Sequence, residues 1–160
     1  MDFPELYSVE RVFPHPIQVA WDAWTNSDAL QSWYHPTELP SVPGSASSDA
    51  RVGGKWSIGI DASKFGFVPY FYGSYTSVEP LVQLVHTMHY TESPEEFELA
   101  DATTESHEVV IDFAEVPSGT SIRFTQFGTL PEGEAERAQA GMESYFDSLG
   151  IYLTNVGEQG

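Results

Sequence analysis

The sequence predicts an α+β fold, in which a curved six-stranded antiparallel sheet is crossed by one long C-terminal helix. Three observations support this class. The last long run, residues 129–156, repeats its apolar side chains at steps of three and four, as an amphipathic helix does. Several runs between residues 6 and 127 alternate with a period of two, as half-buried strands do. Short turns join most of these runs, which implies antiparallel pairing.

The N-terminal part predicts one strand followed by two short helices. Residues 6–13 alternate, and the prolines that follow end this strand. Pro16 suits the first turn of a helix. Asn26 or Ser27 ends that helix and caps a second one over residues 28–33. Neither helix carries a basic side chain, so the pair is not a DNA-reading motif.

The middle of the chain supplies the other five strands, separated by two long connections. The strands are predicted at residues 55–60, 68–78, 81–90, 108–116 and 120–127. Residues 35–51 are rich in proline, serine and glycine and predict a surface loop. Residues 91–106 are acidic and rich in turn formers, and they predict an exposed connection whose role stays open. Gly53 and Gly54 predict a bulge or a close backbone approach at the start of a strand rather than a phosphate loop, because no Gly-Lys-Ser/Thr follows them.

The final helix is the element that the other segments must accommodate. Thr129 and Glu132 have the spacing of a capping box, and Pro131 is tolerated in a first turn. A helix over residues 129–156 would be roughly 40 Å long, which is enough to cross a small sheet. Ile151 falls on its polar side.

Composition bounds the functional classes. With 160 residues the simplest organisation is one domain, residues 1–160. Twenty-four acidic residues against six basic ones give a net charge of −18, which excludes nucleic acid as a partner and disfavours anionic membranes. The absence of cysteine excludes a disulfide framework and a thiolate nucleophile. No apolar run approaches the ~20 residues of a membrane span, and the N-terminus lacks a signal-peptide pattern, so we expect a cytoplasmic protein.

The aromatic content is high, 14% of residues, and it leaves two interpretations open. Aromatic and apolar side chains on the strand faces would meet those on the helix, where they either pack a core or enclose a pocket in which the hydroxyls of Tyr75, Tyr90 and Tyr145 would orient an apolar ligand. The predicted ligand-binding residues are Trp56, Ile58, Phe71, Tyr75, His86, Met88, Tyr90, Phe124, Gln126, Met142, Tyr145, Phe146 and Leu149. For half of the aromatic ones, plain core packing is the alternative.

The chain offers few residues for catalysis or metal binding. His86 and His107 are the histidines to weigh, and His86 is either a packed core group or a polar anchor in the pocket. His86 and His89 are three residues apart on one strand, so they face opposite sides. No metal-ligand spacing and no nucleophile motif occurs, so we predict no metal, no cofactor and no catalytic residue.

Six motifs in order resemble a known family. They are AWDAWTNSDALQSWYHP at residues 20–36, RVGGKW at 51–56, and shorter matches at 71–75, 80–85, 120–128 and 141–153. Together they resemble the activator of Hsp90 ATPase homologue 1-like (AHSA1-like) proteins, which belong to the helix-grip superfamily of START-like and birch-pollen-allergen-like (SRPBCC) domains. The chain departs from the family pattern at Met142, where members usually carry tryptophan.

The resemblance implies a helix-grip fold with a cavity between the sheet and the long helix, which in this superfamily commonly holds a lipid, steroid or aromatic polyketide. The expected function is therefore binding of a small hydrophobic molecule. One alternative is a cyclase-type enzyme that uses His86 or a cavity tyrosine as acid–base. Another is a chaperone-associated interaction domain with a role in the stress response. An Hsp90-type partner is disfavoured, because the eukaryotic relatives also bind through a separate N-terminal domain that this chain is too short to carry. Homodimer formation stays open.

Overall fold

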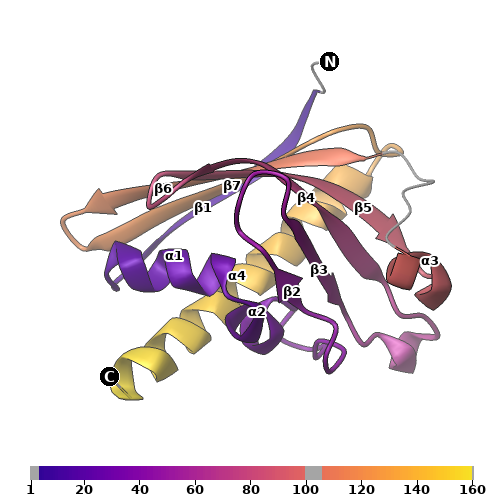
Figure 1. Cartoon of the computed structure of the whole chain (residues 1–160), viewed down its shortest axis with the longest axis horizontal. Helices are drawn as coiled ribbons and strands as arrows, with labels where there is room; N and C mark the ends of the chain where they lie inside the picture. Colours follow the sequence, from indigo (N-terminus) through magenta and orange to yellow (C-terminus); the bar gives the residue numbers. More distant parts are fainter. Residues whose placement is uncertain (1–3, 100–105, 160) are drawn as a thin grey trace.

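The computed structural model of the chain describes residues 4–99 and 106–159. Its seven strands form one antiparallel sheet in the order β1-β7-β6-β5-β4-β3-β2 (Figure 1). The strands are β1 Glu5–Phe13, β2 Ser47–Ser48, β3 Lys55–Gly59, β4 Tyr70–Glu79, β5 Gln83–Thr91, β6 His107–Val116 and β7 Gly119–Phe127. The helices are α1 Ile17–Thr25, α2 Ser27–Trp33, α3 Pro94–Leu99 and α4 Glu134–Gln159, with a short 3-10 turn at Ser63–Phe65.

The α+β class and the long C-terminal helix are confirmed, and the sheet has one strand more than predicted. The additional strand, β2, pairs with β3 at the edge of the sheet, inside the segment predicted as a loop. Two residues are too short for alternation to show in a sequence, so only the pairing reveals this strand.

The two short helices pack beside α4 on the same side of the sheet (Figure 1). Asn26 separates them, and its side-chain oxygen accepts a hydrogen bond from the Ala29 amide at 3.0 Å, as an N-cap does. The indole N–H of Trp33 donates to the Ala23 carbonyl at 2.7 Å, which ties α2 to α1. The predicted pair of helices is therefore confirmed, with Asn26 as the cap.

The long helix begins five residues later than predicted. Gly133 has a φ of +87° in a turn, a conformation that an α-helix cannot contain, and α4 starts at Glu134. The capping box assigned to Thr129 and Glu132 was therefore wrong. The helix also extends to Gln159, beyond the predicted end. Because the helix starts late, the segment before it folds against the sheet instead of continuing the helix.

The acidic connection contains a helix that the prediction missed. In α3 the ring of Phe97 stacks on Tyr70 with centroids 4.4 Å apart, on the sheet face opposite to the one that α4 covers. The sequence carries a helix-start signal here, because a proline directly follows Ser93. In the structure the Ser93 hydroxyl accepts a hydrogen bond from the Glu96 amide at 3.3 Å, as an N-cap does. The last part of this connection, residues 100–105, lies outside the described residues.

The core lies between the sheet and the layer formed by α1, α2 and α4. Leu84 from β5, Phe124 from β7, and Phe146 and Leu149 from α4 have no exposed surface. A Cβ on Gly54 would lie 1.9 Å from the Asp49 carbonyl oxygen, so the predicted close backbone approach is confirmed. No helix among the described residues is long and apolar enough to cross a membrane.

Candidate functional site

A pocket of about 390 Å³ lies between the sheet and the first half of α4. Strands β1, β4, β5, β6 and β7 provide one wall, and α4 provides the other. The lining residues are Tyr7, Tyr34, Phe71, Met88, Tyr90, His107, Gln126, Leu130, Glu134, Arg137, Ala138, Gly141, Met142 and Tyr145. The pocket is thus mainly apolar and aromatic, with a small number of polar groups.

Two local features keep this space open. Gly141 faces the pocket without a side chain, and a Cβ placed there would meet no atom within 4 Å. The late start of α4 leaves Leu130 outside the helix, where its side chain helps to line the pocket. A tryptophan at position 142, as the family pattern has it, would be larger than Met142 and would occupy part of this volume.

A chain of hydrogen bonds runs along the sheet side of the pocket. The Tyr7 hydroxyl donates to Oε1 of Gln126 at 2.6 Å, and Nε2 of Gln126 lies 2.7 Å from Nδ1 of His107. Nε2 of His107 in turn lies 3.2 Å from the carbonyl oxygen of Thr129. These hydrogen bonds join β1, β7, β6 and the segment before α4, so they fix the positions of three polar side chains of the pocket wall, Tyr7, Gln126 and His107.

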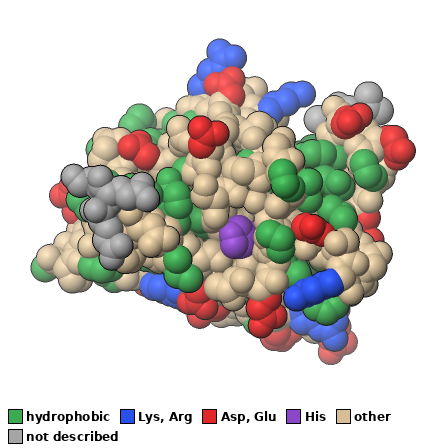
Figure 2. Space-filling view, turned by 90° about the horizontal axis from the view of Figure 1, so that it is seen from below, with side chains coloured by type: hydrophobic (Ala, Val, Ile, Leu, Met, Phe, Trp, Pro, Cys, Tyr) green, Lys and Arg blue, Asp and Glu red, His purple; other side chains and the backbone are tan. Residues whose placement is uncertain are grey.

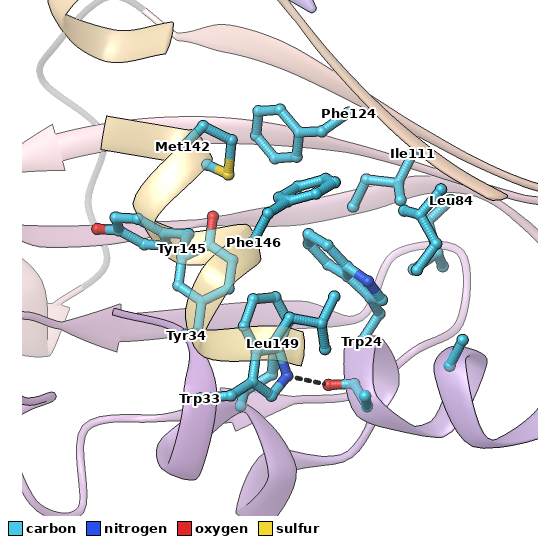
Figure 3. Packing of buried hydrophobic residues seen from close by; sticks show 14 of the residues in the cluster. Trp24, Trp33, Tyr34, Leu84, Ile111, Phe124, Met142, Tyr145, Phe146 and Leu149 are labelled. Carbon is cyan, nitrogen blue, oxygen red and sulfur yellow. Dashed lines mark hydrogen bonds between the residues drawn. The ribbon is translucent and has the colours of Figure 1, made fainter. Parts of the chain in front are cut away.

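Three buried tyrosines converge on the pocket. Burial raises the pKa of Tyr7, Tyr34 and Tyr145, and the neighbouring hydroxyls add to the effect: Tyr34 acts on Tyr7, Tyr145 on Tyr34, and Tyr7 on Tyr145. The rings of Tyr34 and Tyr145 meet edge to face with centroids 5.0 Å apart. Figure 3 shows these two rings near Met142, at one end of the aromatic cluster. The three hydroxyls therefore stay protonated and serve as hydrogen-bonding groups rather than as bases.

The hydroxyls of Tyr34 and Tyr145 are available to a ligand. Neither hydroxyl makes a hydrogen bond to a described residue. Neither oxygen is among the fully buried polar atoms that lack a hydrogen-bond partner, so both keep some accessible surface. Two other predicted hydroxyls are already engaged. Tyr75 bonds Ser48 of β2 at 2.8 Å, and Tyr90 donates to the Glu92 carboxylate at 2.8 Å.

The structure divides the predicted site residues into two groups. Six line the pocket: Phe71, Met88, Tyr90, Gln126, Met142 and Tyr145. Seven lie in the buried core and are not part of the lining: Trp56, Ile58, Tyr75, His86, Phe124, Phe146 and Leu149. Members of both groups share the same strand faces and the same helix face, because the pocket occupies only one end of the space between sheet and helix. Alternation predicts the face but not the position along it.

His86 belongs to the second group. Its ring contacts Trp56 and Tyr75, with centroids 4.5 and 5.8 Å apart, and its Nδ1 lies 3.0 Å from the Thr87 carbonyl oxygen. Burial lowers the pKa of His86 to about 4, so the ring is neutral at physiological pH. This is the packed core group that the sequence left open as one of two roles, and the geometry gives no support to a role for His86 in acid–base catalysis.

Eight lining residues were not among the predicted ligand contacts: Tyr7, Tyr34, His107, Leu130, Glu134, Arg137, Ala138 and Gly141. Tyr7 lies on the buried face of β1, which its alternation had indicated. Tyr34 follows α2 directly, within a motif shared with the family. Leu130 could not be found from the sequence, because it had been assigned to the helix. No three histidine, aspartate or glutamate side chains within residues 4–99 and 106–159 are grouped to hold a metal ion.

One basic side chain, Arg137, lies at the exposed mouth of the pocket. Arg137 is paired with Glu134 one turn earlier in α4 at 3.3 Å, and its side chain is 81% exposed. Figure 2 views the molecule from below the sheet, and acidic side chains are dispersed over this face rather than gathered in one patch. These acidic side chains would repel an anionic ligand as it approaches, whereas they would not repel a neutral one.

Comparisons with known proteins agree with this architecture. Residues 14–154 match the model of the family described as "Activator of Hsp90 ATPase homolog 1-like protein". No protein of curated function matches the chain by sequence.

Solved structures of similar fold come from several bacteria. A protein from Chromobacterium violaceum is 21% identical, with a TM-score of 0.76 over 92% of this chain and 95% of that one. The AHSA1 protein from Silicibacter pomeroyi is 17% identical, with a TM-score of 0.77 over 92% and 96%. An AHSA1-like protein from Aeromonas hydrophila is 23% identical, with a TM-score of 0.71 over 94% and 93%. These likenesses show the fold.

Proposed function

Since the chain belongs to the Activator of Hsp90 ATPase homolog 1-like family, we propose that it binds a small hydrophobic molecule, aromatic or lipid-like, between the sheet and α4. The observation that carries the proposal is the pocket itself. Its volume of about 390 Å³ lies in the range of small-molecule sites, and its walls are mainly aromatic and aliphatic.

The affinity would come from apolar burial and the orientation from the tyrosines. Phe71, Met88 and Met142 offer apolar surface from both sides of the pocket. Removing apolar area from water contributes about 25 cal/mol per Å², so a two-ring aromatic molecule gains most of its binding free energy from contact with these walls. The unpaired hydroxyls of Tyr34 and Tyr145 then select how the polar end of the molecule lies.

Binding without catalysis explains the polar groups better than the cyclase alternative does. A base at neutral pH requires a group that loses its proton there. The pKa of Tyr7, Tyr34 and Tyr145 is raised by burial, so these hydroxyls keep their protons. Both ring nitrogens of His107 are engaged, one by Gln126 and one by the Thr129 carbonyl. We therefore propose a carrier or sensor of apolar molecules rather than an enzyme.

The test is native mass spectrometry of gently purified protein, together with thermal unfolding in the presence of two-ring aromatic compounds. We expect a bound mass or an upward shift of the unfolding midpoint. Met142→Trp occupies part of the pocket and should weaken binding in both assays. Ile151→Trp adds the same ring on the exposed side of α4, where Ile151 is 59% exposed, and should leave binding unchanged. Undiminished binding in Met142→Trp, or no binding to the unmodified chain, would contradict the proposal.

A further inference from the structure

The hydrogen bonds that link Tyr7, Gln126, His107 and the Thr129 carbonyl form one series along the pocket wall. The donor and the acceptor of each bond in this series follow from its last member, the Thr129 carbonyl. The Thr129 carbonyl can only accept, so Nε2 of His107 carries a proton. In the neutral ring Nδ1 then accepts, and it must receive a proton from the Gln126 amide nitrogen at 2.7 Å. This orients the amide so that its oxygen faces Tyr7 and accepts from the Tyr7 hydroxyl at 2.6 Å.

Tyr7 is therefore a pocket hydroxyl with a fixed direction. Its hydrogen is used by Gln126, so towards a ligand its oxygen can only accept. Tyr34 and Tyr145 differ in this respect, because their unpaired hydroxyls can rotate to donate or to accept. Tyr90 also commits its hydrogen, to the Glu92 carboxylate, but its side chain is 41% exposed, whereas Tyr7 is buried. Discrimination between ligands by hydrogen-bond polarity inside the pocket thus rests on Tyr7.

We infer that Tyr7 determines the specificity of the pocket and that His107 is the positioning residue that sets it. The ligand class is a neutral aromatic molecule that bears a hydroxyl or N–H donor at the end facing Tyr7. This inference rests on the proposed function, because it requires a ligand in the pocket. An ether or ketone oxygen at the same place would face lone pairs on Tyr7 and would bind more weakly.

Protonation of His107 would reverse the donor and acceptor roles in the hydrogen bonds that link His107, Gln126 and Tyr7. With protons on both ring nitrogens, His107 needs an acceptor at Nδ1, which the Gln126 amide provides only by turning its oxygen away from Tyr7. The amide nitrogen then donates to Tyr7, and the Tyr7 hydrogen becomes free for the ligand. Selectivity for a donor should become selectivity for an acceptor.

In the described residues, the titratable and charged side chains that share the pocket are Tyr7, Tyr34, Tyr90, Glu134, Arg137 and Tyr145. Glu134 and Arg137 are paired with each other, and the buried tyrosines stay protonated. His107 is partly exposed, so solvent can deliver the proton.

The test compares three probes of one shape: 2-naphthol, 2-methoxynaphthalene and naphthalene. Their affinities are measured by calorimetry or fluorescence at about pH 8 and about pH 5.5, a range in which histidine changes charge. At the higher pH we expect 2-naphthol to bind about fivefold more tightly than the methoxy compound. At the lower pH this preference should vanish or reverse, while naphthalene should bind equally well at both.

Two variants separate this mechanism from a general effect of pH. Gln126→Glu offers acceptors on both sides, so Tyr7 donates to it at either pH and the preference for 2-naphthol should persist at both. Tyr7→Phe removes the fixed acceptor, and the preference should be absent at both. A pH-independent preference in the unmodified chain, or a preference retained in Tyr7→Phe, would overturn the inference. If none of the three probes binds the unmodified chain, the proposed function fails as well.

Discussion

At the scale of single residues, two neighbours on one helix face do different work. Phe146 has no exposed surface and contacts the rings of Phe13 and Trp24, with centroids 5.9 and 6.2 Å apart. Met142 precedes it by one turn and is nearly as buried, but it lines the pocket. The first side chain fills the core, and the second forms part of a wall that faces open space.

Alanine substitutions should separate these two roles. Phe146→Ala opens a cavity in packed surroundings and should lower the free energy of unfolding by about 3–5 kcal/mol. Met142→Ala enlarges a space that already exists, so we expect a loss below about 2 kcal/mol, since the cavity contribution is largely absent. Urea unfolding of both variants measures the difference. Equal losses would show that the pocket is closed and packed in solution.

His86 gives the molecule an acid-labile core. Its pKa is lowered to about 4 by burial, from the 6.5 of a free histidine. The folded pKa lies below the unfolded one, so the contribution to stability is complete above the unfolded pKa and is lost as the pH falls towards the folded pKa. That contribution is about 3 kcal/mol.

The measurement is urea unfolding of the unmodified chain and of His86→Gln between about pH 7 and pH 4. Glutamine cannot gain a proton and can still donate to the Thr87 carbonyl, which His86 approaches at 3.0 Å. We expect the unmodified chain to lose about 3 kcal/mol more than the variant over this range. Parallel pH profiles for the two proteins would be inconsistent with a buried neutral histidine at this position.

At the scale of elements, two glycines near the start of α4 have opposite consequences for stability. Gly133 precedes the helix with a φ of +87°, and Gly141 lies inside it without a positive φ. Neither position would place a Cβ against another atom. Backbone conformation alone therefore decides what a methyl group does at each.

We predict stability changes of opposite sign. Gly133→Ala should destabilise the protein by about 1 kcal/mol, because alanine is strained in the left-handed region. Gly133→Asn is the matched control and should lose less, since asparagine tolerates that region. Gly141→Ala should stabilise by about 0.5–1 kcal/mol as a better helix former, although its methyl group narrows the pocket. Thermal unfolding of the three variants tests the set, and a loss of stability in Gly141→Ala would mean that the space beside it is filled.

At the scale of the whole molecule, charge is the dominant feature. The net charge is −18, and the ion pairs of the described residues use only four of the six cations. Most of these pairs are exposed, so each contributes little. Arg11 is the best placed, because it joins β1 to Asp147 and Glu143 of α4 at 2.6 and 3.4 Å. The remaining carboxylates repel one another in the folded state.

Salt should therefore stabilise the fold. Raising sodium chloride from about 0.05 to about 1 M shortens the screening length to about 3 Å, and we expect the unfolding midpoint to rise by a few degrees. A double variant with Glu98→Lys and Glu136→Lys brings the net charge nearer zero and should show a smaller rise. A midpoint that is unchanged or lower in high salt would show that repulsion among carboxylates does not limit stability.

Much of the fold was predictable because it depends on local patterns. The strand faces that carry Leu84 and Phe124, and the helix face that carries Phe146, follow from periods of two and three to four residues. Strand β2 and helix α3 were missed, because one is too short for periodicity and the other was masked by its acidic composition. The start of α4 was misplaced by a capping pattern at Thr129 that Gly133 overrides.

The sequence by itself determined that a sheet rich in aromatic residues would be covered by a long amphipathic helix, because hydrophobic periodicity is a property of the local sequence. Only the tertiary structure decided which aromatic side chains fill the core and which line the pocket, since that depends on position along a shared face. It also decided the partner of Gln126. Tyr7 meets it across 119 residues of chain, and His107 meets it from the neighbouring strand. Strand pairing brings such groups together, and no local pattern in the sequence records it.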